Sequence, residues 1–206
     1  TAIIHNLRQR QPHLSLCVMT NRPEECAAEF QVATVHRFHP LAVLRALRRS
    51  KALIFGGGNL IQDVTSAKSL LYYLFILGTA QRMGLKTMLY ANGIGPLTTQ
   101  SSLNQVQKIL RRVDVITLRE ESSYQFLQQH HIKAPVMEIT ADETLTMDLP
   151  SKEATRQVLE AEGVDPDHPY FCVSVRPWKE SPADFVESLA KSLDQLAEET
   201  GAQVVL

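Results

Sequence analysis

The sequence predicts an α/β protein built on a parallel sheet with helices on both faces. Short apolar, strand-like runs alternate along the chain with longer stretches whose apolar residues recur at the spacing of a helix. Several strand-like runs also end in glycine or in a polar side chain. Ligands bind at the carboxyl ends of the strands in open α/β sheets, so this pattern also indicates where a site would lie.

The first half of the chain predicts three strands and three helices. We expect strands at 14–20, 30–37 and 52–55, and helices at 1–10, 40–48 and 66–83. The helix at 40–48 is amphipathic, because its apolar residues stand at i, i+3 and i+4. The helix at 66–83 is apolar nearly all round, which predicts that it packs on both sides.

The alternation continues to about residue 149. We expect strands at 86–91, 115–118 and 136–140, and helices at 103–113 and 120–131. Pro150 then breaks the pattern. A helix is expected to start at 151–154, followed by a turn-rich segment at 165–169, a strand at 170–175, a helix at 183–200 and the start of a last strand at 202–206.

Two Rossmann-like domains are the organisation that this order predicts. We assign 1–149 to the first domain, 150–168 to a linker that contains a helix, and 169–206 to the start of a second domain. The chain lacks an initiating Met and its first residues already resemble the middle of a helix. We therefore expect a fragment of a longer protein, with the first strand of the first domain missing and the second domain truncated.

Composition excludes several classes of function. The chain has 206 residues and a net charge of −1, which argues against coating nucleic acid. The basic residues that stand closest together, Arg45, Arg48, Arg49 and Lys51, lie at helical spacing. No signal peptide is visible, and the longest apolar run, 70–77, is too short to cross a bilayer. A cytoplasmic protein without a transmembrane segment is expected.

The three cysteines do not form a redox or metal motif. They are odd in number, scattered, and without the spacing of a Cys-x-x-Cys pair. Cys17 and Cys172 lie inside apolar, strand-like runs. Buried free thiols in a reducing compartment are therefore expected.

The glycine-rich stretch Gly56-Gly57-Gly58 is the first candidate for a ligand site. It follows an apolar strand, and backbone N–H groups at a strand-to-helix turn can hold an anion. It is not a dinucleotide motif, because the third glycine of that motif is replaced by Ile61 and no acidic residue stands at a strand end about 20 residues on.

Three polar side chains follow these glycines within five residues: Asn59, Gln62 and Asp63. They favour recognition of a ligand over a simple tight turn. Asp63 is a candidate base or a partner for a sugar hydroxyl, and equally a candidate cap for a helix starting at Thr65-Ser66.

Further candidates follow the next strands. Asn92-Gly93-Ile94-Gly95-Pro96 is either a simple turn or a second wall of the same site. Arg119 can pair with the adjacent Glu120 and Glu121, or can bind a carboxylate or phosphate. Asp142 is a candidate ligand residue or a cap for a turn at Thr144, and with Glu143 alone it does not predict a metal site. Arg176, before Pro177-Trp178, is the corresponding strand-end cation of the second domain, and Trp178 is a core residue or a lid.

Together these residues resemble the polysaccharide pyruvyl transferase family. The stretches that carry the resemblance, which spans essentially the whole chain, are Gly56-Gly57-Gly58-Asn59-Leu60-Ile61-Gln62-Asp63, Thr65-Ser66, Ser69-Leu70-Leu71-Tyr72-Tyr73, Gly93-Ile94-Gly95-Pro96, Ile116-Thr117-Leu118-Arg119-Glu120 with Ser123, Thr140-Ala141-Asp142 and Ser174-Val175-Arg176-Pro177-Trp178. Each stretch is weak alone, but their order is specific.

The resemblance implies two Rossmann-like domains arranged as in GT-B glycosyltransferases, with the site in a cleft between them. It implies transfer of pyruvate from phosphoenolpyruvate to two sugar hydroxyls of a cell-wall or exported polysaccharide precursor, with no metal and no cofactor beyond this donor substrate. Asp63 and Arg119 would be catalytic, and Arg119 would hold the donor. Substrate contacts would come from Gly56, Gly57, Gly58, Asn59, Gln62, Asn92, Gly93, Gly95, Asp142 and Arg176.

The implied acceptor is a nucleotide-linked or lipid-linked saccharide, which leaves peripheral association with a membrane open. Further basic and histidine residues of the second domain would lie beyond Leu206, so the chain alone is expected to be inactive. Two other interpretations stay open at this point. One is a GT-B glycosyltransferase that uses a nucleotide sugar at the same glycine-rich edge, and the other is a Rossmann-like binding module without catalysis.

Overall fold

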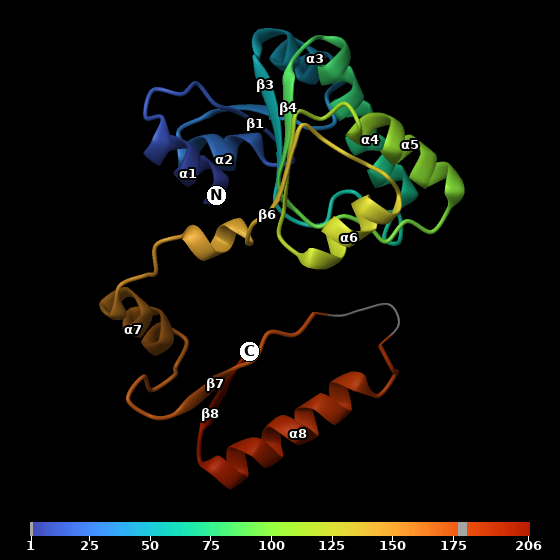
Figure 1. Cartoon of the computed structure of the whole chain (residues 1–206). Coiled ribbons are helices and arrows are strands. Elements are labelled where there is room, and N and C mark those ends of the chain that lie inside the picture. Colours follow the sequence, from blue (N-terminus) through green and yellow to red (C-terminus); the bar gives the residue numbers. More distant parts are fainter. Residues whose placement is uncertain (1, 177–180) are drawn as a thin grey trace. The chain divides into compact units, whose positions relative to one another are not determined.

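Figure 1 shows the computed structural model of the chain, in which residues 2–176 and 181–206 are described. The chain divides into two compact units, one ending at Met147 and the other beginning at Asp148. Within the described residues, no helix is both long enough and apolar enough to cross a membrane. The domain boundaries expected from the sequence stay a prediction.

A four-stranded parallel sheet is the centre of the N-terminal unit. Its strands lie in the order in which they occur in the chain: β3 (Ala52–Gly56), β4 (Lys86–Asn92), β5 (Val115–Leu118) and β6 (Val136–Ile139). Each strand is connected to the next through a helix: α4 (Ala67–Arg82), α5 (Gln100–Leu110) and α6 (Glu121–Gln129). Because parallel neighbours need such crossovers, the predicted α/β alternation is confirmed.

A second, two-stranded parallel sheet precedes this one. Its strands are β1 (Cys17–Thr20) and β2 (Ala33–His36), and the helices of this region are α1 (Ala2–Arg10), α2 (Pro23–Phe30) and α3 (Pro40–Arg49). In Figure 1, α1 and α2 lie on one side of β3 and β4, and α4 and α5 lie on the other side. The sequence did not predict α2, although Pro23 at its start and two glutamates in its first turn are typical of a helix N-terminus.

Two apolar clusters form the core, and α4 contributes to both. The larger one joins Leu70, Leu74 and Leu77 of α4 to residues of α5, α6 and the four-stranded sheet. The smaller one joins Ile76 and Ala80 of α4 to α3, and both sheets pack against it. The predicted packing of this helix on both sides is confirmed by the two clusters, but another face is open, where Leu71 and Phe75 are exposed.

The cysteines also differ from expectation. All three are free thiols, but Cys17 and Cys172 are exposed, not buried. Each lies at one end of a short strand that has a single neighbouring strand among the described residues, so little packs over it.

The C-terminal unit is a small β-α-β arrangement. It consists of α7 (Lys152–Ala161), β7 (Tyr170–Cys172), α8 (Phe185–Thr200) and β8 (Gln203–Val205). The strands β7 and β8 pair in parallel, as expected for one crossover of a Rossmann-like sheet. Gly201 ends α8 in the left-handed conformation that favours glycine.

Candidate functional site

The candidate site lies at the carboxyl edge of the four-stranded sheet. Four segments with polar or glycine residues leave the sheet there: the Gly57-Gly58 turn after β3, residues 93–96 after β4, Arg119 after β5 and Asp142 after β6. Because the strands are parallel neighbours, these segments leave the sheet at the same edge.

The turn after β3 is a left-handed turn followed by a loop. Gly57 and Gly58 have φ of 68° and 71°, which an L side chain adopts only with strain. The helix predicted at 66–83 is confirmed, because α4 begins at Ala67 and its N-cap is Ser66, so a loop separates the glycine turn from this helix. The N–H of Gly57 donates to the carbonyl of Tyr90 over 3.1 Å, so this donor is already used within the fold.

The two glycine segments lie side by side and are joined by hydrogen bonds. The N–H of Gly93 donates to the Gly58 carbonyl over 3.2 Å, and that of Gly95 donates to the Ile61 carbonyl over 2.8 Å. The side-chain amide of Asn59 adds a bond of 2.9 Å to the Gly95 carbonyl. The backbone of both segments is therefore fixed as one unit.

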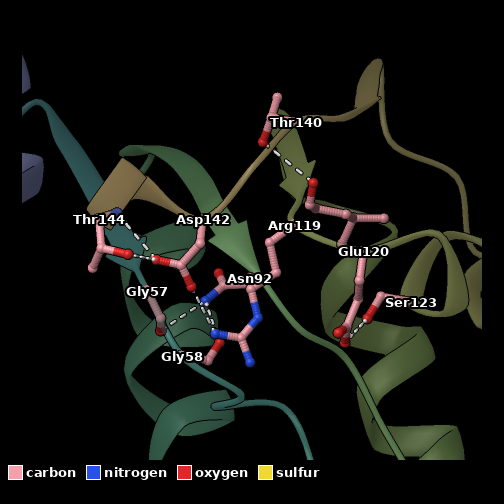
Figure 2. Close-up of polar contacts among 10 residues, drawn as sticks. Gly57, Gly58, Asn92, Arg119, Glu120, Ser123, Thr140, Asp142 and Thr144 are labelled. Carbon is pink, nitrogen blue, oxygen red and sulfur yellow. Dashed lines mark hydrogen bonds and ion pairs between the residues drawn. The ribbon is translucent and has the colours of Figure 1, made fainter. Parts of the chain in front are cut away.

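An irregularity in β4 aims Asn92 at this unit. The register between β4 and β5 shifts between Leu89 and Asn92, and Ala91 has a φ of 50°. The Thr117 hydroxyl accepts the N–H of Ala91 over 2.8 Å and so supports the bulge. The fully buried Asn92 donates to the carbonyls of Gly57 and Gly58, over 3.1 and 3.3 Å (Figure 2). Asn92 thus holds the glycine turn in place.

An ion pair between Arg119 and Asp142 is the main electrostatic feature of this edge. One guanidinium nitrogen of Arg119 lies 3.0 Å from a carboxylate oxygen of Asp142 (Figure 2). The hydroxyl and the backbone N–H of Thr144 donate to the other carboxylate oxygen, over 2.7 and 3.1 Å. These bonds from Thr144, followed by the Arg119 pair, hold the pKa of Asp142 below its usual range despite partial burial.

Arg119 retains capacity to bind an anion. Its side chain is 29% exposed, and the bond to Asp142 uses one of its two terminal nitrogens. A guanidinium carries five N–H donors in a planar fork that suits carboxylate and phosphate. Among the described residues, no other side chain accepts a hydrogen bond from it. The adjacent glutamates are not its partners, contrary to one of the two interpretations of the sequence.

Asp142 serves two purposes. It is the N-cap of a short 3-10 helix, η1 (Glu143–Thr146), as the capping interpretation of the sequence proposed. It also orients Arg119, which reaches it from the neighbouring strand end. A carboxylate that is fixed by two other donors is a rigid anchor for the guanidinium.

Glu143 was not among the residues predicted for the site. Its carboxylate lies directly against Gly57, where an added Cβ would collide with it. One of its carboxylate oxygens is buried and has no hydrogen-bond partner among the described residues. The only signal in the sequence was its position next to Asp142 after a strand.

Glu120 and Ser123 were also missed as site residues. The Ser123 hydroxyl donates to the Glu120 carboxylate over 2.9 Å and accepts the N–H of Ile94 over 2.8 Å. A Cβ on Gly93 would lie 2.9 Å from that same carboxylate, so only glycine fits there without a shift. Glu120 and Ser123 therefore bind the segment after β4 to the start of α6.

Asp63 and Gln62 lie on the loop that follows the glycine turn, and both side chains form hydrogen bonds within the protein. The buried Asp63 accepts the N–H of Thr98 over 2.7 Å, near the start of α5. It does not cap a helix at Thr65-Ser66 as one interpretation proposed, because the Ser66 hydroxyl itself accepts the N–H of Ser69. Gln62 hydrogen-bonds Thr65 through both its oxygen and its nitrogen.

The pKa of Asp63 follows from this environment. Burial raises it, but hydrogen bonds from Ser102, Thr98 and Thr99 outweigh burial and hold it below its ordinary value. Asp63 is therefore a charged group that fixes the loop against α5. The catalytic role expected for it stays a prediction.

The remaining candidates are in the C-terminal unit. Arg176 is exposed and follows β7, and its role in substrate binding stays a prediction. Pro177 and Trp178 lie outside the described residues. Across 2–176 and 181–206, no three His, Cys, Asp or Glu side chains are grouped closely enough to hold a metal ion.

Comparison with known proteins identifies one family. A family model described as "Polysaccharide pyruvyl transferase" matches residues 1–206. No curated protein matches the chain. The family match covers every strand end described above.

Proposed function

The chain belongs to the polysaccharide pyruvyl transferase family, and we propose that it transfers pyruvate from phosphoenolpyruvate to two hydroxyl groups of a saccharide. The family itself supports a transferase that acts on a saccharide acceptor. The identity of the donor and the roles of the residues below belong to the proposal.

The proposed reaction forms a cyclic ketal. A proton added to the methylene carbon of phosphoenolpyruvate makes C2 cationic, and the first sugar hydroxyl attacks C2 and releases its proton. The bond from C2 to the phosphate oxygen then breaks, and the second hydroxyl attacks C2 as inorganic phosphate leaves. One of the two hydroxyl protons restores the acid that protonated the methylene carbon. The other is taken up by the leaving phosphate. The site must therefore bind two anionic groups and move a proton.

Arg119 is the observation that carries the proposal. It places a cation with unused N–H donors at the carboxyl edge of the sheet, where α/β proteins bind ligands. Phosphoenolpyruvate carries a carboxylate and a phosphate, and a planar guanidinium can bind either through two parallel bonds. Asp142 would keep the guanidinium oriented while the donor binds.

Glu143 is the proposed carrier of the proton. A carboxylate with one buried, unpartnered oxygen can take a proton from a sugar hydroxyl and return it to carbon. Its contact with Gly57 holds it beside the glycine turn, and the backbone of that turn is fixed by Asn92. The sugar would be held in this part of the edge, within reach of Asn59 and Gly93.

We further propose that the protein acts in the cytoplasm on a nucleotide-linked or lipid-linked precursor of a cell-wall or exported polysaccharide. This part of the proposal rests on the family. The acceptor is defined here only by its chemistry, as a sugar with two hydroxyls close enough to close one ketal ring.

Release of inorganic phosphate tests the proposal. The full-length protein is incubated with phosphoenolpyruvate, with and without a panel of saccharide acceptors. We expect phosphate release that depends on the acceptor, together with a ketal methyl signal in the product. Turnover of a nucleotide sugar on the same acceptors would instead favour a GT-B glycosyltransferase. Binding of saccharide without turnover of either donor would favour the non-catalytic module.

A further inference from the structure

Charge is distributed very unevenly along the chain. Between Phe30 and Val113 there are eleven basic side chains and one acidic side chain, Asp63. From Asp114 to Leu206 there are seven basic and eighteen acidic side chains. The net charge of −1 hides this asymmetry. A charge difference of this size between parts of a chain is typical of proteins that bind an anionic surface.

The basic residues gather on the helix layer formed by α3, α4 and α5. The exposed ones on or just after these helices are Arg45, Arg48, Arg49, Lys68, Arg82, Lys108, Arg111 and Arg112. In the part of the chain that the structure describes, none of these eight is paired with a carboxylate. In Figure 1, α4 and α5 lie side by side, and the smaller core cluster joins α3 to α4.

Large apolar side chains are exposed on the same layer. Leu71 and Phe75 lie one turn apart on α4 and are 48% and 58% exposed. Phe38 and Leu41 lie just before and at the start of α3 and are 61% and 59% exposed. The ring of Phe38 lies 5.5 Å from that of Tyr72, the residue next to Leu71, so the two groups adjoin. We call these four residues, with Arg45, Arg48 and Lys68, the α3–α4 face.

We propose that the α3–α4 face binds the surface of an anionic lipid bilayer. Basic side chains are attracted to anionic headgroups. Exposed Leu and Phe side chains between them can enter the boundary between headgroups and acyl chains. The combination fits a lipid surface better than it fits nucleic acid, whose phosphates offer nothing to exposed aliphatic side chains.

Stabilisation of the helices does not account for this face. Cations in the last turn of a helix interact favourably with its dipole, which explains Arg48, Arg49 and Arg82. The same effect opposes Lys68, which stands in the first turn of α4. It also gives no reason for Leu71 and Phe75 to face solvent on a helix whose other sides are buried.

The proposal goes beyond pyruvyl transfer and does not depend on it. The membrane contact would be peripheral. If the acceptor is linked to a lipid, the same contact would hold the enzyme at the membrane that carries the acceptor. A soluble, nucleotide-linked acceptor would leave the binding of the α3–α4 face unchanged.

Co-sedimentation with lipid vesicles tests the proposal. The full chain is titrated with vesicles of phosphatidylcholine alone and with vesicles that contain one third phosphatidylglycerol, at about 0.1 M salt, where exposed charges more than about 10 Å apart are screened. We expect binding to the phosphatidylglycerol vesicles only. Raising the salt to about 0.5 M should weaken it. Equal binding to both kinds of vesicle, or to neither, would overturn the proposal.

Surface variants locate the binding. The double variant Arg45→Glu/Arg48→Glu and the double variant Leu71→Ser/Phe75→Ser should each weaken binding at least about tenfold. The matched controls are Arg10→Glu/Lys133→Glu and Val158→Ser/Val186→Ser, which change exposed residues outside this face and should bind like the parent. Thermal unfolding checks that every variant folds.

Two results would contradict the assignment. Controls that lose as much affinity as the α3–α4 variants would show that no particular face binds lipid. Duplex DNA that competes fully with the vesicles would assign the basic surface to nucleic acid.

Discussion

Arg119 owes its orientation to a residue that is 23 positions away in the chain. The sequence marks Arg119 and Asp142 separately, because each follows a strand, but offers the adjacent glutamates as the nearer partners. Neighbouring residues at a strand-to-helix turn point in different directions, whereas residues that leave adjacent parallel strands converge on one edge. Glu143 escaped prediction for the same reason. What distinguishes it is its packing against Gly57, a contact between segments far apart in sequence.

Asp63 provides a prediction at the scale of a single carboxylate. Its hydrogen bonds hold its pKa below the ordinary value, so it stabilises the fold fully above that value of about 3.9. The stabilisation is then lost as the pH falls through the lower, folded-state pKa. We expect Asp63→Asn to destabilise the chain by about 1–2 kcal/mol at pH 7, and the difference from the parent to shrink below about pH 4.

Urea unfolding at pH 7, 5 and 3.5 measures this difference. Glu138→Gln, at an exposed carboxylate of β6 in the same unit, serves as the control and should show no comparable loss. A loss for Asp63→Asn that stays constant over this pH range would contradict the assigned charge interactions.

At the scale of elements, the two glycine turns show what a sequence pattern can and cannot predict. The pattern correctly indicates that chain direction changes after β3 and β4, because glycine after an apolar strand favours a turn. It does not indicate that residues 57–66 form a loop paired to the next turn by hydrogen bonds. That pairing depends on the bulge at Ala91, where a non-glycine residue with positive φ leaves no signal in the sequence.

The helices likewise divide into those that the sequence pattern predicts and those that it does not. Periodicity predicts α3, α4 and α5 well, since each has a continuous buried side. It fails for α2, which has no fully buried residue to set its period. It also suggests too much burial for α4, because apolar composition does not reveal whether another element covers Leu71 and Phe75.

The paired glycines of the first turn allow a matched experiment. Both Gly57 and Gly58 have positive φ, so alanine should cost about 1–2 kcal/mol of stability at either position. Only at Gly57 would the new Cβ collide with the Glu143 carboxylate, since nothing lies within 4 Å of a Cβ at Gly58. We therefore expect Gly57→Ala to lower kcat at least about tenfold, and Gly58→Ala to leave it nearly unchanged.

Acceptor-dependent phosphate release by the full-length protein provides the measurement, with unfolding curves to verify equal stability. A Gly58→Ala variant as impaired as Gly57→Ala would remove Glu143 from the proposed mechanism. Full activity of Gly57→Ala would have the same consequence.

On the scale of the whole molecule, the catalytic proposal and the lipid-binding proposal concern different parts of the N-terminal unit. The catalytic proposal uses the carboxyl edge of the four-stranded sheet, and the lipid-binding proposal uses the outer side of α3 and α4. The fold class and the family follow from the sequence, because alternating elements and the order of several motifs are properties of the whole chain. The lipid-binding surface does not, because total charge averages over regions of opposite sign.

Binding of phosphoenolpyruvate to the parent chain and to Arg119→Ala tests the central claim most directly. Titration calorimetry should show that the substitution costs at least about 2 kcal/mol of binding free energy, or about 30-fold in Kd, because it removes a charged donor from a bound anion. Arg10→Ala, at an exposed arginine of α1, should bind the donor like the parent. Equal affinity of Arg119→Ala and the parent for phosphoenolpyruvate would contradict the assignment of this edge as the donor site.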